Sequence, residues 1–150
     1  MRIYLGSDHA GFALKQKIVQ FFQEHNYNFQ DLGNIEFDKD DDYPDYGLKV
    51  AKKVAEESAR GILICGSSFG ICMVANKIKG IRAASVSSIE DAKMTREHND
   101  ANIICLSGWH SDMAVVKRII DTFLDTKFST DERHIRRVEK IKNIEDGKHI

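Results

Sequence analysis

Residues 61–77 read GILICGSSFGICMVANK, and this stretch predicts a strand, a tight glycine-rich loop and a helix in direct succession. The apolar run Ile62–Ile64 has the length and the branched side chains of a strand that is buried on both faces. From Ile71 onward, apolar residues recur at helical spacing. Cys65 therefore stands at the carboxyl end of the strand, where open α/β sheets bind their ligands.

The loop at 66–70 lies between Cys65 and the expected helix. A helix that starts after such a loop offers unpaired N–H groups and the positive end of its dipole, which suits a phosphate or an oxyanion. The same field would lower the pKa of a neighbouring thiol. The loop lacks the GK[ST] ending of a P-loop. A cysteine at the end of a buried strand can also be only a small apolar core residue, so the loop alone leaves both interpretations of Cys65 open.

The rest of the chain alternates strands and helices around this stretch. Further strands are expected at 2–6, 27–32 (near an edge), 81–86 and 102–106, and helices at 12–25, 45–58, 89–97, 113–124 and from 130 or 131 to about 145. An acidic loop is expected over 34–46. Five strands that alternate with helices predict a three-layer α/β/α sandwich around a five-stranded parallel sheet, Rossmann-like, in one domain of residues 1–150.

Composition excludes several classes of protein. The formal charge of −1 argues against a general nucleic-acid binder, which needs a basic excess. No apolar stretch approaches the roughly 18–20 residues of a membrane span, and the N-terminus does not resemble a signal peptide. Cys65, Cys72 and Cys105 lack metal-binding spacing, so we expect reduced thiols in a cytoplasmic protein with no metal and no membrane or nucleic-acid partner.

Polar residues follow several of the expected strands. Since the strand-to-helix loops of a parallel sheet open on one edge, their side chains should converge there. The edge collects Asp8 and His9, the loop 65–70 and residues 108–111, with His98 and Asn99 around it. A hydrophobic core does not require the polar groups gathered here, which are a thiol, two histidines, a carboxylate and a glycine loop. The sequence therefore predicts a functional site.

Each of these residues also has a plainer interpretation. His9 would serve equally as the first residue of a helix capped by Asp8, and His98 as a cation that favours a helix C-terminus. Arg133, Arg136 and Arg137 would then be a solvated helix face.

The stretch 38–42 (DKDDD) is acidic but lacks the glycine and the distal glutamate of a calcium loop, which favours a solvated loop. Tyr43, beside the single proline of the chain, is suited to lie rigidly over a pocket.

Five motifs resemble those of the type B ribose-5-phosphate isomerases, a family that includes galactose-6-phosphate isomerase subunits and allose-6-phosphate isomerase. They are GSDHAGF at 6–12, DYP at 42–44, ICGSSFGICMVANKIKGIRAA at 64–84, REHNDAN at 96–102 and RHIRRVEKI at 133–141. They occur in the family's order and spacing over nearly the whole chain. The resemblance implies a metal-free, cofactor-free aldose–ketose isomerisation of ribose 5-phosphate to ribulose 5-phosphate through a cis-enediolate.

The same resemblance implies roles for individual residues. Cys65 as thiolate is the base, Ser67 hydrogen-bonds the O1/O2 pair, and His98 opens the sugar ring. The backbone amides of Gly66, Ser68, Phe69 and Gly70 form the oxyanion hole. Asp8, His9, Tyr43 and Asn99 bind the sugar, and the phosphate is held by His9, Arg133 and Arg137 with His134 nearby. The protein is expected to be a homodimer or tetramer, whose C-terminal helix (130–145) reaches across a dimer interface. The resemblance also implies that the site lies at this interface, with His98 and the C-terminal arginines contributed by the second chain.

Two departures from the family concern substrate specificity. Ser68-Phe69 replaces a glycine and a small aliphatic residue, so Ser68 is expected either to crowd the oxyanion hole or to adopt a backbone angle that glycine tolerates better. Trp109-His110 stands where the family has x-Arg after Gly108, which removes one phosphate ligand for which His110 would have to compensate. The alternatives are therefore the same isomerisation of a hexose 6-phosphate (allose or galactose 6-phosphate), or a non-catalytic sugar-phosphate binding protein.

Overall fold

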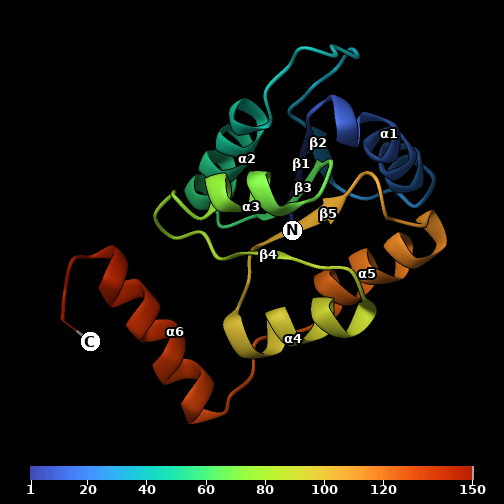
Figure 1. The fold of residues 1–150 in the computed structure, drawn as a ribbon. Helices are drawn as coiled ribbons and strands as arrows, with labels where there is room; N and C mark the ends of the chain where they lie inside the picture. The colour runs from blue at the N-terminus through green and yellow to red at the C-terminus, as the bar shows by residue number, and fades with distance from the viewer. Residues whose placement is uncertain (150) are drawn as a thin grey trace.

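The computed structural model describes residues 1–149, and strands and helices alternate along this length (Figure 1). The strands are β1 (Ile3–Ser7), β2 (Phe29–Asp31), β3 (Arg60–Cys65), β4 (Ala83–Ser85) and β5 (Ile103–Ser107). The helices are α1 (His9–Glu24), α2 (Tyr43–Glu57), α3 (Phe69–Ala75), α4 (Ile89–Asn99), α5 (Met113–Asp125) and α6 (Glu132–Glu145). Ile150 lies outside the described residues.

The sheet has the strand order β2-β1-β3-β5-β4, and all its pairings are parallel. β3 is central and buried on both faces. Ile62 and Ile64 pack with residues of α1, α4 and α5, whereas Leu63 and Cys65 pack with residues of α2 and α3. Figure 1 shows α2 and α3 on one side of the sheet and α4 and α5 on the other. The predicted parallel sheet and three-layer architecture are confirmed.

Several helix boundaries differ from the predicted ones. α1 begins at His9 because the carboxylate of Asp8 accepts a hydrogen bond from the Gly11 N–H at 3.0 Å and so caps the helix. α2 begins at Tyr43 and takes in Pro44 at its first turn, where the missing N–H costs no hydrogen bond. The acidic loop is therefore shorter than expected.

Helix α3 is shorter than the apolar spacing suggested. It ends at Ala75, and Ile78 lies beyond it. Asn76 terminates the helix, because its side-chain amide donates to the Ala83 carbonyl at 2.8 Å and its amide oxygen accepts from the Ala83 N–H at 2.8 Å. The chain is thereby directed into β4.

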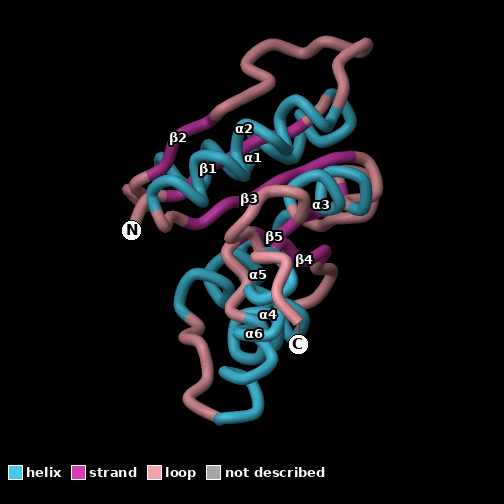
Figure 2. Tube along the Cα trace, turned by 90° about the vertical axis from the view of Figure 1, so that its left-hand side faces the viewer, coloured by secondary structure: helices cyan, strands magenta, loops and turns pink. Residues whose placement is uncertain are grey.

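Helix α6 projects from the body of the molecule beside α4 (Figures 1 and 2). Asp131 caps it by accepting a hydrogen bond from the Arg133 N–H at 2.9 Å. Of the two predicted caps, residues 130 and 131, the structure has the second. Val138 is buried, but the apolar side chains of Ile135, Ile141 and Ile144 are exposed. A single chain therefore leaves an apolar surface of α6 uncovered. None of the helices in the described part of the chain is both long and apolar enough to span a membrane.

Candidate active site

The carboxyl ends of β1, β3 and β5 are joined by backbone hydrogen bonds. The Asp8 N–H donates to the Ile64 carbonyl at 3.3 Å, and the Gly108 N–H donates to the Cys65 carbonyl at 2.8 Å. Cys65 is the last residue of β3 and is 4% exposed. The predicted convergence of Asp8, Cys65 and Gly108 at one edge of the sheet is confirmed.

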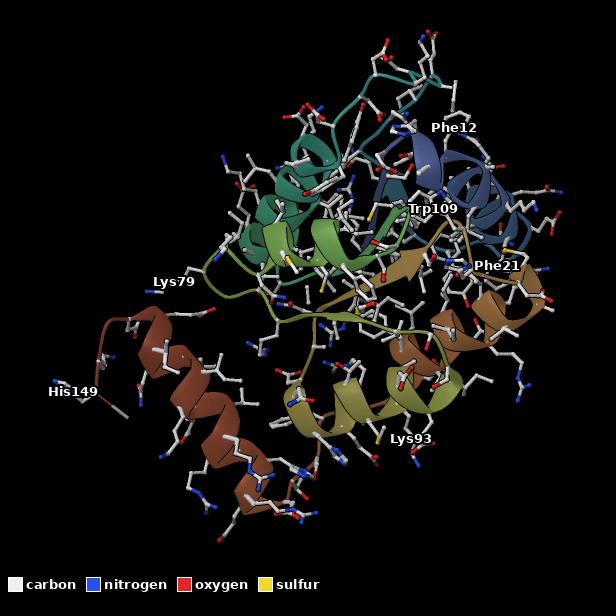
Figure 3. The ribbon with its side chains drawn as sticks, in the orientation of Figure 1. Phe12, Phe21, Lys79, Lys93, Trp109 and His149 are labelled. Carbon is white, nitrogen blue, oxygen red and sulfur yellow. The ribbon has the colours of Figure 1, made fainter. Side chains whose placement is uncertain are left out.

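Two aromatic rings flank the loop 66–70. The Trp109 indole lies so close to Gly66 that a Cβ there would fall 2.5 Å from the ring, and the Tyr43 ring is 2.7 Å from the corresponding point on Gly70. Any side chain at either glycine would displace the ring beside it. Trp109 is itself 67% exposed, and Figure 3 shows it near the end of β3. The loop is thus bounded by an indole on one side and a phenol on the other.

Ser68 departs from ordinary backbone geometry. Its φ of 74° lies in the left-handed region, which costs a residue with a Cβ about 1–2 kcal/mol. Its hydroxyl is 2.5 Å from the Ser85 hydroxyl, so the side chain is turned towards β4. Ser68 was expected either to crowd the oxyanion hole or to adopt a backbone angle that glycine tolerates better, and the structure has the unusual backbone angle.

His9 is held by a carboxylate from the acidic stretch. Its backbone N–H and its ring Nδ1 each lie 2.8 Å from Asp41 Oδ1. The hydrogen bond to Asp41 raises the pKa of His9, and the charge of Asp8 adds to the effect. Burial raises the pKa of the Asp8 carboxyl. The side chain of Asp41 is only 5% exposed, so the expectation that the whole stretch 38–42 is solvated is wrong for Asp41. It holds for the exposed neighbours Asp38 and Asp40.

A cavity of about 620 Å³ opens beside the loop, within the range of small-molecule sites. Ser67, Ser68 and Phe69 form one wall. Serines of 85–87 and the segment 109–112 form the others. Ser67 Oγ accepts a 3.4 Å hydrogen bond from the Phe69 N–H, and the amides of the first turn of α3 have no intrahelical acceptors. Within residues 1–149, no group of three or more His, Cys, Asp or Glu side chains is placed to hold a metal ion.

A second cluster lies where α4 meets α6. The rings of His98 and His134 are 4.4 Å apart between centroids, and the Ser129 N–H donates to the Glu97 carbonyl at 3.0 Å. Burial, and the charge that His98 can carry, lower the pKa of His134. On the same helix, Arg133 and Arg137 are exposed.

The expectation that His98 and Asn99 surround the edge near Cys65 is wrong for a single chain. The Asn99 carbonyl accepts from Arg82 Nε at 3.0 Å, and Arg82 directly precedes β4. Asn99 therefore lies at the amino edge of the sheet, opposite Cys65. The physical reason is that a crossover helix starts at the carboxyl edge and returns to the amino edge, so its last residues leave the site at which it began.

Three polar residues with buried side chains were not expected from the sequence: Asp41 bonds His9, Asn34 bonds Asp41, and Lys15 bonds Asn34. Lys15 is fully buried, and its ammonium group donates to the Asn34 carbonyl at 2.7 Å. A signal for Lys15 was available, because it follows Gly11 by four residues and precedes Ile18 by three on the buried face of α1. Asp41 carried no such signal within its acidic stretch.

The chain is similar in sequence to known proteins over most of its length. A sequence model of the family described as Ribose/Galactose Isomerase matches residues 3–141. The chain is 43% identical to the probable ribose-5-phosphate isomerase B of Mycoplasma genitalium, over 93% of this chain and 92% of that protein. It is 39% identical to ribose-5-phosphate isomerase B of Mycobacterium tuberculosis, over 93% of this chain and 86% of that protein.

Solved structures agree with these relatives. Ribose-5-phosphate isomerase B of Clostridium thermocellum has a TM-score of 0.92 and 43% identity, with 98% of this chain and 99% of that chain covered. The M. genitalium protein with bound ribulose-5-phosphate has a TM-score of 0.91 and 42% identity, with 97% of this chain and 96% of that chain covered.

Proposed function

Because this chain belongs to the ribose/galactose isomerase family, we propose that it interconverts ribose 5-phosphate and ribulose 5-phosphate. The observation that carries the proposal is the meeting of Cys65, the loop 66–70 and Asp8 at one edge of the sheet. Ser67, Ser68 and Phe69 of this loop also line a cavity. The named relatives support the choice of substrate, and a structure of one of them contains ribulose-5-phosphate.

In the proposed reaction, Cys65 as thiolate takes the proton from C2 of the open-chain sugar and returns it to C1. The carbonyl oxygen becomes an enediolate oxygen, which the backbone amides of Gly66, Ser68, Phe69 and Gly70 stabilise. Ser67 hydrogen-bonds the O1/O2 pair and exchanges the hydroxyl proton between them. Its position beside the first-turn amides supports this role.

A second copy of the chain completes the proposed site. His98 of that copy opens the sugar ring, Asn99 binds hydroxyl groups, and Arg133 with Arg137 holds the phosphate. Two observations support this: Asn99 lies at the far edge of its own sheet, and α6, which carries both arginines, has an uncovered apolar face. Burial and neighbouring positive charges lower the pKa of His134, so the cationic groups proposed to contact the phosphate are Arg133, Arg137 and His9.

The first test is turnover of ribose 5-phosphate by purified, metal-free protein, compared with allose 6-phosphate and galactose 6-phosphate. We expect ribose 5-phosphate to have the highest kcat/KM. A preference for a hexose phosphate would favour the alternative that Trp109, which lies against Gly66, shapes the cavity for a longer sugar. Binding of these sugar phosphates without turnover of any would support a non-catalytic binding protein instead.

Mixing two inactive variants tests the shared site. In Cys65→Ser and His98→Asn homodimers every site is defective, but a hybrid dimer has one site with both residues intact. Random exchange makes about half of the dimers hybrid, so we expect the mixture to recover about a quarter of wild-type activity. Hybrid formation is checked with two affinity tags. Hybrids that form without recovering activity would show that His98 and Cys65 act in the same chain.

A further inference from the structure

The loop between β2 and α2 carries a series of polar contacts that ends at His9. The loop projects at the top of the molecule in Figure 1, yet Asn34 within it is 5% exposed. The Asn34 N–H donates to the Ser7 carbonyl at 3.0 Å, and its carbonyl accepts from Lys15 Nζ at 2.7 Å. Its side-chain amide donates to Asp41 Oδ2 at 2.7 Å.

The other oxygen of the same carboxylate faces His9. Asp41 Oδ1 receives both the backbone N–H and the ring Nδ1–H of His9, each at 2.8 Å. Two bonds to one oxygen fix the ring relative to its backbone, and Nδ1 is the protonated nitrogen in this arrangement. Nε2 is then the nitrogen left to meet a ligand. Since the His9 side chain is 39% exposed, a ligand can reach the ring.

The stretch 38–42 holds four aspartates, of which only Asp41 is turned inward. Its neighbours Asp38 and Asp40 are exposed. The Phe37 ring, 5.9 Å from that of Phe12, also attaches this loop to α1. The loop is therefore attached to α1 on the N-terminal side of Asp41, and α2 begins two residues after Asp41.

We propose that Asp41 is a positioning residue: held by Asn34, it orients the His9 ring and retains its proton, so that His9 binds the phosphate of the substrate as a cation. This inference rests on the proposed function for the identity of the ligand. The contact between Asp41 and His9 belongs to the chain itself and is testable without any substrate.

Electrostatics support this role. The hydrogen bond to Asp41 raises the pKa of His9, the carboxylate of Asp8 acts in the same direction, and partial burial opposes both. In the proposed dimer, Arg133 and Arg137 of the second copy would also oppose them, so the pKa has to be measured in the assembled protein. Because the folded pKa lies above that of the unfolded chain, about 6.5, the stabilisation from this pair is complete below that pH. It is lost as the pH rises through the folded value.

The direct test is an NMR titration of His9 in the ligand-free protein, with its signal assigned by its disappearance in His9→Gln. Asp41→Asn should lower the pKa of His9. The matched control is Asp40→Asn, which removes the same charge from an exposed position one residue away and should leave the His9 pKa where it is in the wild type. Asn34→Ser should shift the His9 pKa in the same direction by less, and it substitutes for Asp41→Asn if that variant does not fold. An unchanged His9 pKa in the folded variants would overturn the proposal.

Kinetics provide the second readout. At a pH between the His9 pKa values measured in the two proteins, Asp41→Asn should raise KM for ribose 5-phosphate about tenfold and leave kcat within about twofold, because only phosphate binding is weakened. At a pH below both measured values the KM difference should narrow to about twofold, since His9 is then protonated in both proteins. Asp41→Glu should recover part of the loss. A fall in kcat with KM unchanged would contradict the positioning role. Absence of turnover in the wild type would refute the proposed function and leave the titration to decide on Asp41.

Discussion

Cys65→Ser is expected to lower kcat for ribose 5-phosphate by about 10³-fold, equivalent to about 4 kcal/mol of transition-state stabilisation. A serine hydroxyl is a far weaker acid than a thiol, so the variant lacks a base for the proton on C2. The substitution is almost isosteric at a position that is 4% exposed, so the fold and the phosphate contacts should persist. KM should stay within about threefold of the wild-type value. Stopped assays of ribulose 5-phosphate formation, with binding of a sugar-phosphate analogue followed separately, give both quantities.

The matched control is Cys72→Ser. Cys72 lies on α3, packs against the same core as Cys65 and is half-buried. A general effect of removing a thiol from this part of the fold would lower the activity of both variants. Turnover by Cys65→Ser close to that of Cys72→Ser would show that another group takes the proton, and Asp8, whose carboxyl pKa is raised by burial, would be the next to test.

Lys15→Met is expected to reduce the free energy of unfolding by about 3–5 kcal/mol. Lys15 is fully buried on α1, and its ammonium group binds both the Asp31 carboxylate and the Asn34 carbonyl. Methionine fills a similar volume but leaves that carboxylate, which is 17% exposed, without its cation. Urea unfolding followed by circular dichroism measures the loss.

Two further variants make this result specific. Lys17→Met removes an exposed lysine from the same helix and should change stability by less than about 0.5 kcal/mol. Adding Asp31→Asn to Lys15→Met should restore part of the lost stability, because the uncompensated charge disappears. If Lys15→Met lies within about 1 kcal/mol of the wild type, the buried ion pair is not a major source of stability.

The fold could be predicted because its strands leave a strong local pattern. β3 is covered by helices on both faces, so Ile62–Ile64 forms an unbroken apolar run rather than an alternating one. The meeting of Cys65 and Asp8 at one edge could also be predicted, because all strands of a parallel sheet end at the same edge. Strand ends were less predictable, and β4 has three residues where six were expected, because the short register with β5 is set by pairing and not by composition.

The parts of the site that could not be predicted depend on partners distant in sequence. His9 and Asp41 are 32 residues apart, and Lys15 and Asp31 are 16 apart. No periodicity relates them, since the path of the loop between β2 and α2 decides which aspartate turns inward. Within a single chain, the position of His98 was misjudged for a different reason: the length of α4 carries its last residues to the opposite edge of the sheet.

The contact between Trp109 and Gly66 gives the protein an intrinsic optical probe. Trp109 is the single tryptophan of the chain, and its largely exposed indole lies against the first glycine of the loop. Fluorescence excited selectively at tryptophan therefore comes from one position, beside the cavity. A sugar phosphate that enters the cavity would displace water from the indole and shift its emission. Affinity can then be read in proteins that no longer turn over, including the Cys65 variant.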